Sequence, residues 1–174
     1  FFLLTIASEK GSAQHSSPNI LNTHFIQTHI NIDGRLNEPV WNTAPTISNF
    51  TQRELKEGKP ATEKTKVAVL YDKKNLYVGV WCFDSHPDKI IASQMKRDFD
   101  YGIDDNFMLI IDTYGDSRTA YLFVTNPNGA RNDGMISGNG HSRNFSWDGV
   151  WNVKTSRTSK GWFAEFKIPF STES

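Results

Sequence analysis

The chain has 174 residues, 19 acidic and 19 basic residues, and an aromatic content of 13%. This length is sufficient for one domain with a sizeable hydrophobic core. The net charge of zero argues against a nucleic-acid-binding protein, which needs a basic face, so we expect no nucleic-acid partner. The single cysteine, Cys82, excludes a disulfide framework within the chain, and its apolar neighbours predict a buried thiol.

The first 13 residues are typical of the second half of a secretory signal peptide. An apolar run from Phe1 to Ala7 is followed by polar and small residues, so we expect cleavage near Ala13 and an exported protein. A short buried strand is the alternative interpretation. Residues 14–26 form a polar leader, which places the folded domain at residues 27–174. Alternatively, residues 20–26 close the fold as a further strand.

A tight turn followed by a buried tryptophan is expected at the start of the domain. Asp33 and Gly34 form a turn dipeptide, Pro39 restricts the backbone, and Trp41 follows. None of these side chains is suited to chemistry, and a tryptophan next to Val40 favours an apolar environment. We interpret this segment as the entry to a β-sandwich.

The rest of the chain consists of short apolar segments separated by polar turns. The predicted strands are 66–71, 76–83, 107–112, 119–126, 149–155 and 161–168. The first two and the last two form hairpins, and the one weak helix signal is at 87–93. This spacing predicts an all-β fold, an antiparallel β-sandwich of the immunoglobulin or jelly-roll kind. Because no closing strands follow residue 168, we expect the fold to be truncated at its C-terminus.

An ordered series of short motifs resembles family 9 carbohydrate-binding modules, which begin with an Asp-Gly turn, an acidic residue and a tryptophan. In the subgroup that the series resembles most, the module is the amino-terminal domain of large exported Gram-negative proteins and precedes a domain like an outer-membrane β-barrel. The resemblance therefore implies a periplasmic, outer-membrane or cell-surface location, and a downstream barrel domain as partner. The motifs are Pro60-Ala-Thr-Glu63, Leu70-Tyr-Asp72, Asn75-Leu-Tyr77, Asp104-Asp105, Asp112-Thr113, Asn126-Pro127, Gly129-Ala130, Asp133-Gly134 and Ser146-Trp-Asp-Gly-Val-Trp151.

The loop from Asp98 to Asp105 holds most of the candidate chemistry. Its aspartates could form a glycosidase pair only in a deep cleft with one raised pKa, and turn capping is the alternative role. Hard oxygen ligands near Gly102 suggest Ca²⁺, with Asp98 and Asp100 as ligands. Neither a hydrolase nor a metalloprotease motif is present in the sequence, so we expect no catalytic activity from this chain.

A sugar site requires an aromatic face and planar hydrogen-bonding groups. The resemblance places the stacking aromatic residue near Tyr101. The family's glutamate and arginine, which bind sugar hydroxyl groups, align with Met108 and Val124, so this chain lacks both polar side chains. Trp147 is the second platform candidate, and Trp151 is assigned to the core. The predicted ligand-binding residues are Arg97, Tyr101, Asp104, Asp105, Arg131 and Trp147.

Three functions follow as hypotheses. The first is a non-catalytic carbohydrate-binding module of an exported multidomain protein that binds glycans or serves their catabolism. The second is a structural or interaction domain attached to an outer-membrane barrel, without sugar binding. The third is a haem-binding electron-transfer domain, because related sandwiches hold haem through methionine. Its candidate ligands are Met95, Met108 and Met135.

Overall fold

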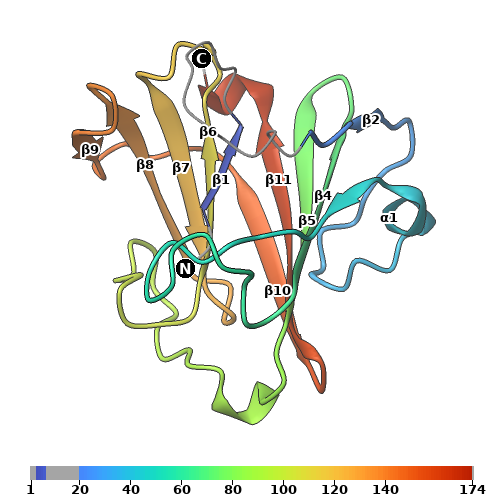
Figure 1. Ribbon diagram of the computed structural model, residues 1–174. Coiled ribbons are helices and arrows are strands. Elements are labelled where there is room, and N and C mark those ends of the chain that lie inside the picture. The colour runs from blue at the N-terminus through green and yellow to red at the C-terminus, as the bar shows by residue number, and fades with distance from the viewer. Residues whose placement is uncertain (1–2, 7–19, 174) are drawn as a thin grey trace.

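The computed structural model describes residues 3–6 and 20–173 and contains two β-sheets packed face to face. Sheet A has the order β1-β6-β7-β8-β9, and sheet B has the order β10-β11-β5-β4-β2, with β3 also paired to β4 (Figure 1). The strands of sheet A are β1 (Leu3–Ile6), β6 (Phe107–Ile111), β7 (Ala120–Thr125), β8 (Arg131–Ser137) and β9 (Ser142–Asn144). Those of sheet B are β2 (His24–Phe25), β3 (Thr46–Ile47), β4 (Thr65–Tyr71), β5 (Asn75–Phe83), β10 (Asn152–Thr158) and β11 (Gly161–Pro169).

The main core lies between the two sheets and follows from the two-residue period of their strands. On sheet B, Val78 and Val80 of β5 face inward with Phe166 of β11, and all three are fully buried. Phe107 and Phe123 on sheet A meet them, with the Phe107 and Phe166 ring centroids 5.9 Å apart. Cys82 lies in this core, where burial raises the pKa of its thiol to about 12.

A second core covers the outer face of sheet B. The short helix α1 (Pro39–Thr43) lies on this face and brings Trp41 against Trp81, with ring centroids 6.2 Å apart. Gly79 makes this packing possible, because a Cβ there would lie 2.9 Å from the Trp41 ring. The central strand β5 is therefore buried on both faces, which explains why it reads as a continuous apolar run in the sequence.

Glu165 fixes the second core to the sheet. It projects from β11 among apolar residues and is fully buried, and burial raises the pKa of its carboxyl group. Its Oε1 accepts a hydrogen bond of 2.8 Å from Trp41 Nε1. Its Oε2 accepts two from the backbone N–H groups of Asp33 and Gly34, at 3.1 and 3.0 Å. The Asp-Gly turn and the tryptophan thus share one carboxylate.

The sandwich confirms the predicted fold class, and the burial of Trp41 and Trp151 confirms their assignment to the core. Each predicted strand is present to within one to three residues at its ends. The strands β8 and β9 were not predicted, because Arg131–Ser137 and Ser142–Asn144 are polar and carry no apolar alternation. The helix predicted at 87–93 shortens to a single 3-10 turn, η1 (Pro87–Lys89). A second one, η2 (Phe170–Glu173), follows β11.

Two segments that the sequence places before the folded domain, one in the signal-peptide remnant and one in the polar leader, pair with the sheets. Residues 3–6 form β1, parallel to β6, within the stretch expected to be a signal peptide remnant. Residues 24–25 form β2, parallel to β4, and Ile26 is buried in the second core. The described sandwich therefore includes residues before 27, as the closing-strand alternative suggests.

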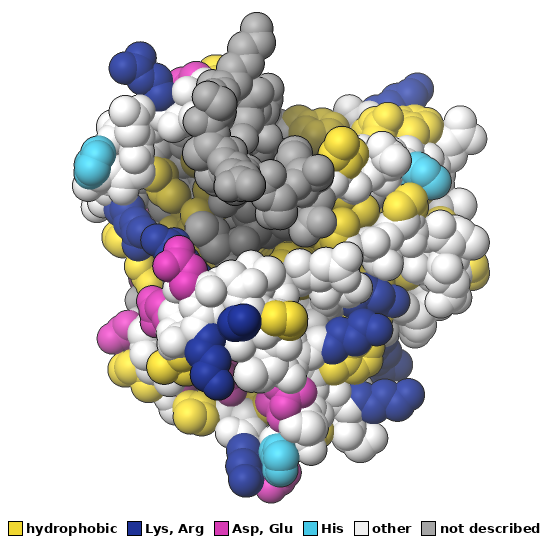
Figure 2. Space-filling model, in the orientation of Figure 1, with side chains coloured by type: hydrophobic (Ala, Val, Ile, Leu, Met, Phe, Trp, Pro, Cys, Tyr) yellow, Lys and Arg dark blue, Asp and Glu magenta, His cyan; other side chains and the backbone are white. Residues whose placement is uncertain are grey.

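The surface in view carries charged side chains of both signs. Figure 2 shows Lys and Arg side chains interspersed with Asp and Glu on this face, as the net charge of zero suggests. No helix within the described residues is long and apolar enough to cross a membrane.

We predict that Trp41→Phe lowers the free energy of unfolding by about 2–3 kcal/mol, because it leaves a buried carboxylate oxygen of Glu165 without a donor and opens a small void. Urea denaturation measures this loss. In the background of Glu165→Leu the same substitution should cost at least about 1 kcal/mol less, since no carboxylate is left unpaired. Strictly additive losses in this double-mutant cycle would show that the hydrogen bond does not couple the two residues.

Candidate functional site

The segment between β5 and β6 brings most of the predicted site residues to one end of the sandwich (Figure 1). Its backbone is tied to the edge of sheet A, where the N–H of Asp98 donates to the carbonyl of Arg131 at 2.7 Å. A reciprocal pair closes the segment on itself. The N–H of Ile91 donates to Asp105 Oδ2 at 2.8 Å, and the N–H of Asp105 donates to the Ile91 carbonyl at 2.9 Å.

Asp104 anchors this segment from inside and is only 5% exposed. Its Oδ1 accepts from the backbone N–H and the hydroxyl of Ser93, and its Oδ2 accepts from the N–H of Gln94 and the amide of Asn126. Burial opposes ionisation of Asp104, but these donors outweigh it and hold its pKa at about 2. All four bonds are internal, so the side chain has a structural role in the loop and we do not retain it as a sugar contact.

Arg97 belongs to a second internal cluster, which joins this segment to β8 and to the loop before β10. Its Nη2 donates to both carboxylate oxygens of Asp133, at 2.8 and 3.0 Å, and its Nε donates to Asp148 at 3.0 Å. The Asp133 side chain is completely buried and also accepts from the N–H of Gly149 at 2.6 Å. Burial raises the pKa of Asp133, against the lowering effect of the Gly149 N–H, Trp151 and Arg97. Arg97 is therefore a structural counter-ion.

The two expected Ca²⁺ ligands have different local partners. Asp100 Oδ1 accepts from the N–H of Gly102 in a local turn. Asp98 instead lies with Asp133 and Asp148, where three carboxylate oxygens are within 4.8 Å of one another. The Arg97 guanidinium already lies 2.8 Å from Asp133 and Asp148 and 3.9 Å from Asp98. Because a cation bound there would be repelled by this guanidinium, these residues do not fit a calcium site.

Arg131 and Trp147 are also occupied by packing. Arg131 donates to the backbone carbonyl of Trp151, and its guanidinium lies 5.6 Å from the Trp151 ring centroid. Trp147 is half-buried between the sheets, 4.9 Å from the ring of Tyr121 and 6.1 Å from that of Phe123. The structure therefore does not place Trp147 in one site with Tyr101.

Tyr101 lies on the other face of sheet A, beside a residue that the sequence did not reveal. Its half-buried ring packs on the outer-face cluster that contains Phe99 and lies 6.0 Å from the ring of Phe145, which is 40% exposed. Gly134 makes room for Phe145, because a Cβ there would lie 3.1 Å from its ring. Tyr101 and Phe145 form an aromatic pair, which we call the Tyr101 platform.

At the two positions where the resemblance implies hydrogen-bonding residues for a sugar, this chain has buried apolar side chains. Met108 is 2% exposed and Val124 is fully buried, and both pack beneath Phe99. A sugar ring cannot reach either position without displacing this cover. The three methionines of the haem hypothesis are also separated: Met95 is exposed in the loop, while Met108 faces outward and Met135 inward on sheet A.

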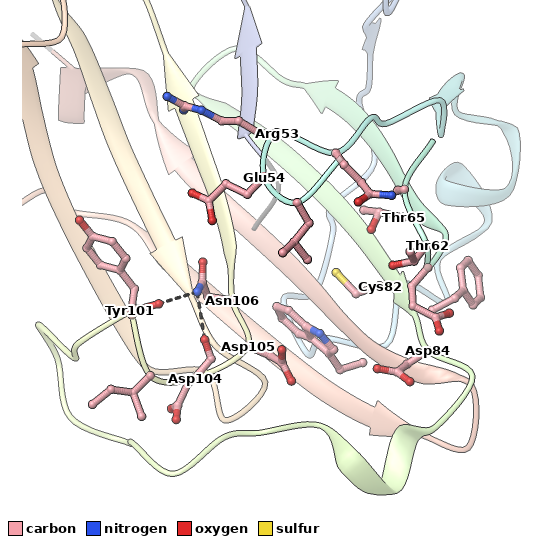
Figure 3. Close-up of a pocket in the computed structure, with 18 residues that line it drawn as sticks. Arg53, Glu54, Thr62, Thr65, Cys82, Asp84, Tyr101, Asp104, Asp105 and Asn106 are labelled. Atoms are coloured by element: carbon pink, nitrogen blue, oxygen red, sulfur yellow. Dashed lines mark hydrogen bonds between the residues drawn. The ribbon is translucent and has the colours of Figure 1, made fainter. Parts of the chain in front are cut away.

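Next to the Tyr101 platform is a cavity of about 680 Å³, at the end of the sandwich between the loop 50–63 and the loop 100–106. Figure 3 shows its labelled polar residues, contributed by both loops and by the ends of β4 and β5. Tyr101, Asp104 and Asp105 are the predicted site residues that line it. Leu55 also lines it, and this fully exposed residue adopts a φ of 68°, a strained conformation for leucine.

Comparison with known proteins gives one family and several solved structures. Residues 32–174 match the family model described as carbohydrate family 9 binding domain-like. A family 9 carbohydrate-binding module from Caldicellulosiruptor kristjanssonii in complex with cellotriose is similar at a TM-score of 0.59 and 15% identity, over 86% of this chain and 68% of that chain. The same kind of module from that organism in complex with glucose gives a TM-score of 0.53 at 15% identity, over 86% and 70%.

A proposed carbohydrate-binding protein from Bacteroides uniformis ATCC 8492 gives a TM-score of 0.64 at 10% identity, covering 98% of this chain and 74% of that chain. At such identities the likeness of all three structures concerns the fold. No curated protein matches the sequence.

We predict that Asp104→Asn destabilises the protein by about 2 kcal/mol at neutral pH. The pKa of Asp104 is lowered by folding, so its contribution is present above the pKa of the unfolded chain and is lost as pH falls from about 5 to about 2. Urea denaturation of both proteins across this range should show the difference shrinking. Asp88→Asn, at an exposed aspartate, is the control. A difference that is independent of pH would contradict the assignment.

Proposed function

The chain belongs to the carbohydrate family 9 binding domain-like family, and from this we propose that it is a non-catalytic carbohydrate-binding module. The observation that carries the proposal is the family match over residues 32–174, together with a cavity at one end of the sandwich and a partly exposed aromatic pair beside it. The similarity to modules solved with cellotriose and glucose supports β-linked glucose oligomers as the first ligands to test.

The proposed sugar contacts are the site residues whose ring face or carboxylate oxygen remains available to a ligand. Tyr101 supplies an aromatic face for the apolar C–H side of a sugar ring, and the Phe145 ring, tilted by 44° to it, adds apolar surface beside that face. Asp105 is exposed and lines the cavity, with one oxygen bonded to the Ile91 N–H, so its other oxygen can accept from a sugar hydroxyl. Arg97 and Asp104 hold the loop that presents Tyr101 and Asp105, whereas Arg131 packs against Trp151.

We further propose that the module is part of an exported, multidomain protein of the cell envelope that binds glycan or serves its breakdown. The apolar stretch from Phe1 to Ala7 supports export, and the motif series supports an amino-terminal position before a β-barrel-like domain. On this proposal the module holds the parent protein at a glycan surface or delivers glycan to it.

A structural or interaction domain without sugar binding is the second candidate function. The specific observation in its favour is the outer face of sheet A. There Met108 and Val124 occupy the positions of the family's sugar-binding glutamate and arginine, and both are buried in one cluster with Phe99. A face closed in this way supplies packing rather than hydrogen bonds to hydroxyl groups.

We predict that Tyr101→Ala weakens the binding of cellotriose by about 10- to 100-fold, because one stacking aromatic contributes roughly 1–3 kcal/mol. Isothermal titration calorimetry of the whole chain measures the affinity. Tyr114→Ala is the matched control, since Tyr114 is 69% exposed in the turn at the opposite end of β6. Urea denaturation of both variants verifies that the fold is kept.

Absence of binding to cellotriose, to glucose and to a broader glycan array would favour the interaction domain over the carbohydrate-binding module. Equal losses of affinity in the Tyr101 and Tyr114 variants would remove the Tyr101 platform from the site but leave the function itself in place.

A further inference from the structure

The cavity beside the Tyr101 platform has an unbalanced charge. Of the described residues that line it, five carry carboxylates and one, Arg53, carries a positive charge. The carboxylates are Glu54, Glu63, Asp84, Asp104 and Asp105. This imbalance contrasts with the net charge of zero for the whole chain, so the acidic residues are concentrated at the cavity.

No cationic side chain among the described residues forms an ion pair with these carboxylates. Glu63 accepts from the hydroxyl and N–H of Ser85, Asp84 accepts from the N–H of His86, and Asp105 accepts from that of Ile91, which are all neutral donors. The described ion pairs all involve Arg97 and Asp98, Asp133 or Asp148, which lie outside the cavity lining. In Figure 3 the Arg53 guanidinium points away from Asp84 and Asp105.

The cavity also contains a buried acceptor that has no donor. The amide of Asn106 donates to the backbone carbonyls of Tyr101 and Asp104, at 2.7 and 3.0 Å, which fixes its orientation. Its Oδ1 is buried and has no hydrogen-bond partner among the described residues. In the view of Figure 3 this oxygen points toward the side of the cavity where Glu54 lies. A buried acceptor without a donor is costly, and a ligand N–H or O–H group would satisfy it once a small movement of the Asn106 side chain opens this oxygen to the cavity.

We propose that this cavity selects glycans that bear amino groups over neutral glycans and over acidic ones. The inference rests on the proposed function and names the ligand class of that same site. An ammonium group carries three donors and no acceptor, so it complements a lining of carboxylates and an unpaired amide oxygen. A uronic acid presents a further carboxylate to the same lining and is repelled. A volume of about 680 Å³ lies within the usual range for small-ligand sites.

The test compares three trimers with the same β-1,4-linked backbone: cellotriose, the glucosamine trimer and the glucuronic acid trimer. Calorimetry with the whole chain at about pH 6, where sugar amines are protonated, should show the glucosamine trimer binding at least about tenfold more tightly than cellotriose. The uronate trimer should bind most weakly. The preference should shrink when salt is raised from about 20 mM to about 300 mM, because salt screens exposed charges.

Variants separate the cavity from the general surface charge. Glu54→Gln combined with Asp84→Asn, two cavity carboxylates that are not among the proposed hydroxyl contacts, should remove most of the preference for the glucosamine trimer and leave cellotriose within about twofold. Glu57→Gln combined with Asp88→Asn is the matched control, since both residues are exposed, carry the same charge and lie outside the cavity lining. This control pair should keep the preference.

Each outcome decides the proposal. Cellotriose binding as tightly as the glucosamine trimer overturns the selectivity and leaves the carbohydrate-binding function standing. A preference that survives in the cavity variant, or that falls equally in both variants, also overturns it, because the charge would then act from elsewhere. Failure of all three trimers and of a wider neutral glycan array would reject the binding function itself, together with the selectivity.

Discussion

The carboxylate of Glu165 is the interaction on which the second core depends. It lies on the outer face of β11 and collects three donors from a segment more than 120 residues earlier in the chain. Without these donors a buried carboxylate would cost several kcal/mol, and without the carboxylate the turn at Gly34 would leave a buried N–H group unpaired. Because the segment is held there, Trp41 covers the sheet and β5 is buried on both faces.

Buried aspartates of sheet A and of the loop before β6 have the same role. Asp104 and Asp133 are buried acceptors that take hydrogen bonds from loop backbone and side chains rather than from ligand. Each joins segments that are distant in sequence: Asp104 joins Ser93 to Asn126, and Asp133 joins Arg97 to Gly149. Such anchoring lowers the entropy that a loop loses on binding, so it supports recognition without supplying a contact.

The acidic loop from Asp98 to Asp105 therefore contains both structural carboxylates and a carboxylate that faces the cavity. A loop with four aspartates suggests a ligand-binding or metal-binding loop, but each of the four has a different role. Asp104 is internal, Asp100 caps a local turn, Asp98 lies beside Arg97, and Asp105 faces the cavity. The carboxylates that give the cavity its charge come mostly from other segments, with Glu54 contributed by the loop 50–63 and Asp84 by the end of β5.

The sequence by itself determined the sandwich, because apolar alternation and turn dipeptides are local signals that the strands from Thr65 to Tyr71 and from Gly161 to Pro169 display in full. It also determined the family and the burial of Trp41. Tertiary structure alone decided which polar side chains have internal partners and which are available to a ligand. Hydrogen-bond partners such as Ser93 for Asp104 or Asp133 for Arg97 are set by chain crossing, which no local pattern encodes. The polar strand β8, the aromatic pair of Tyr101 with Phe145, and the cavity likewise arise only when distant segments meet.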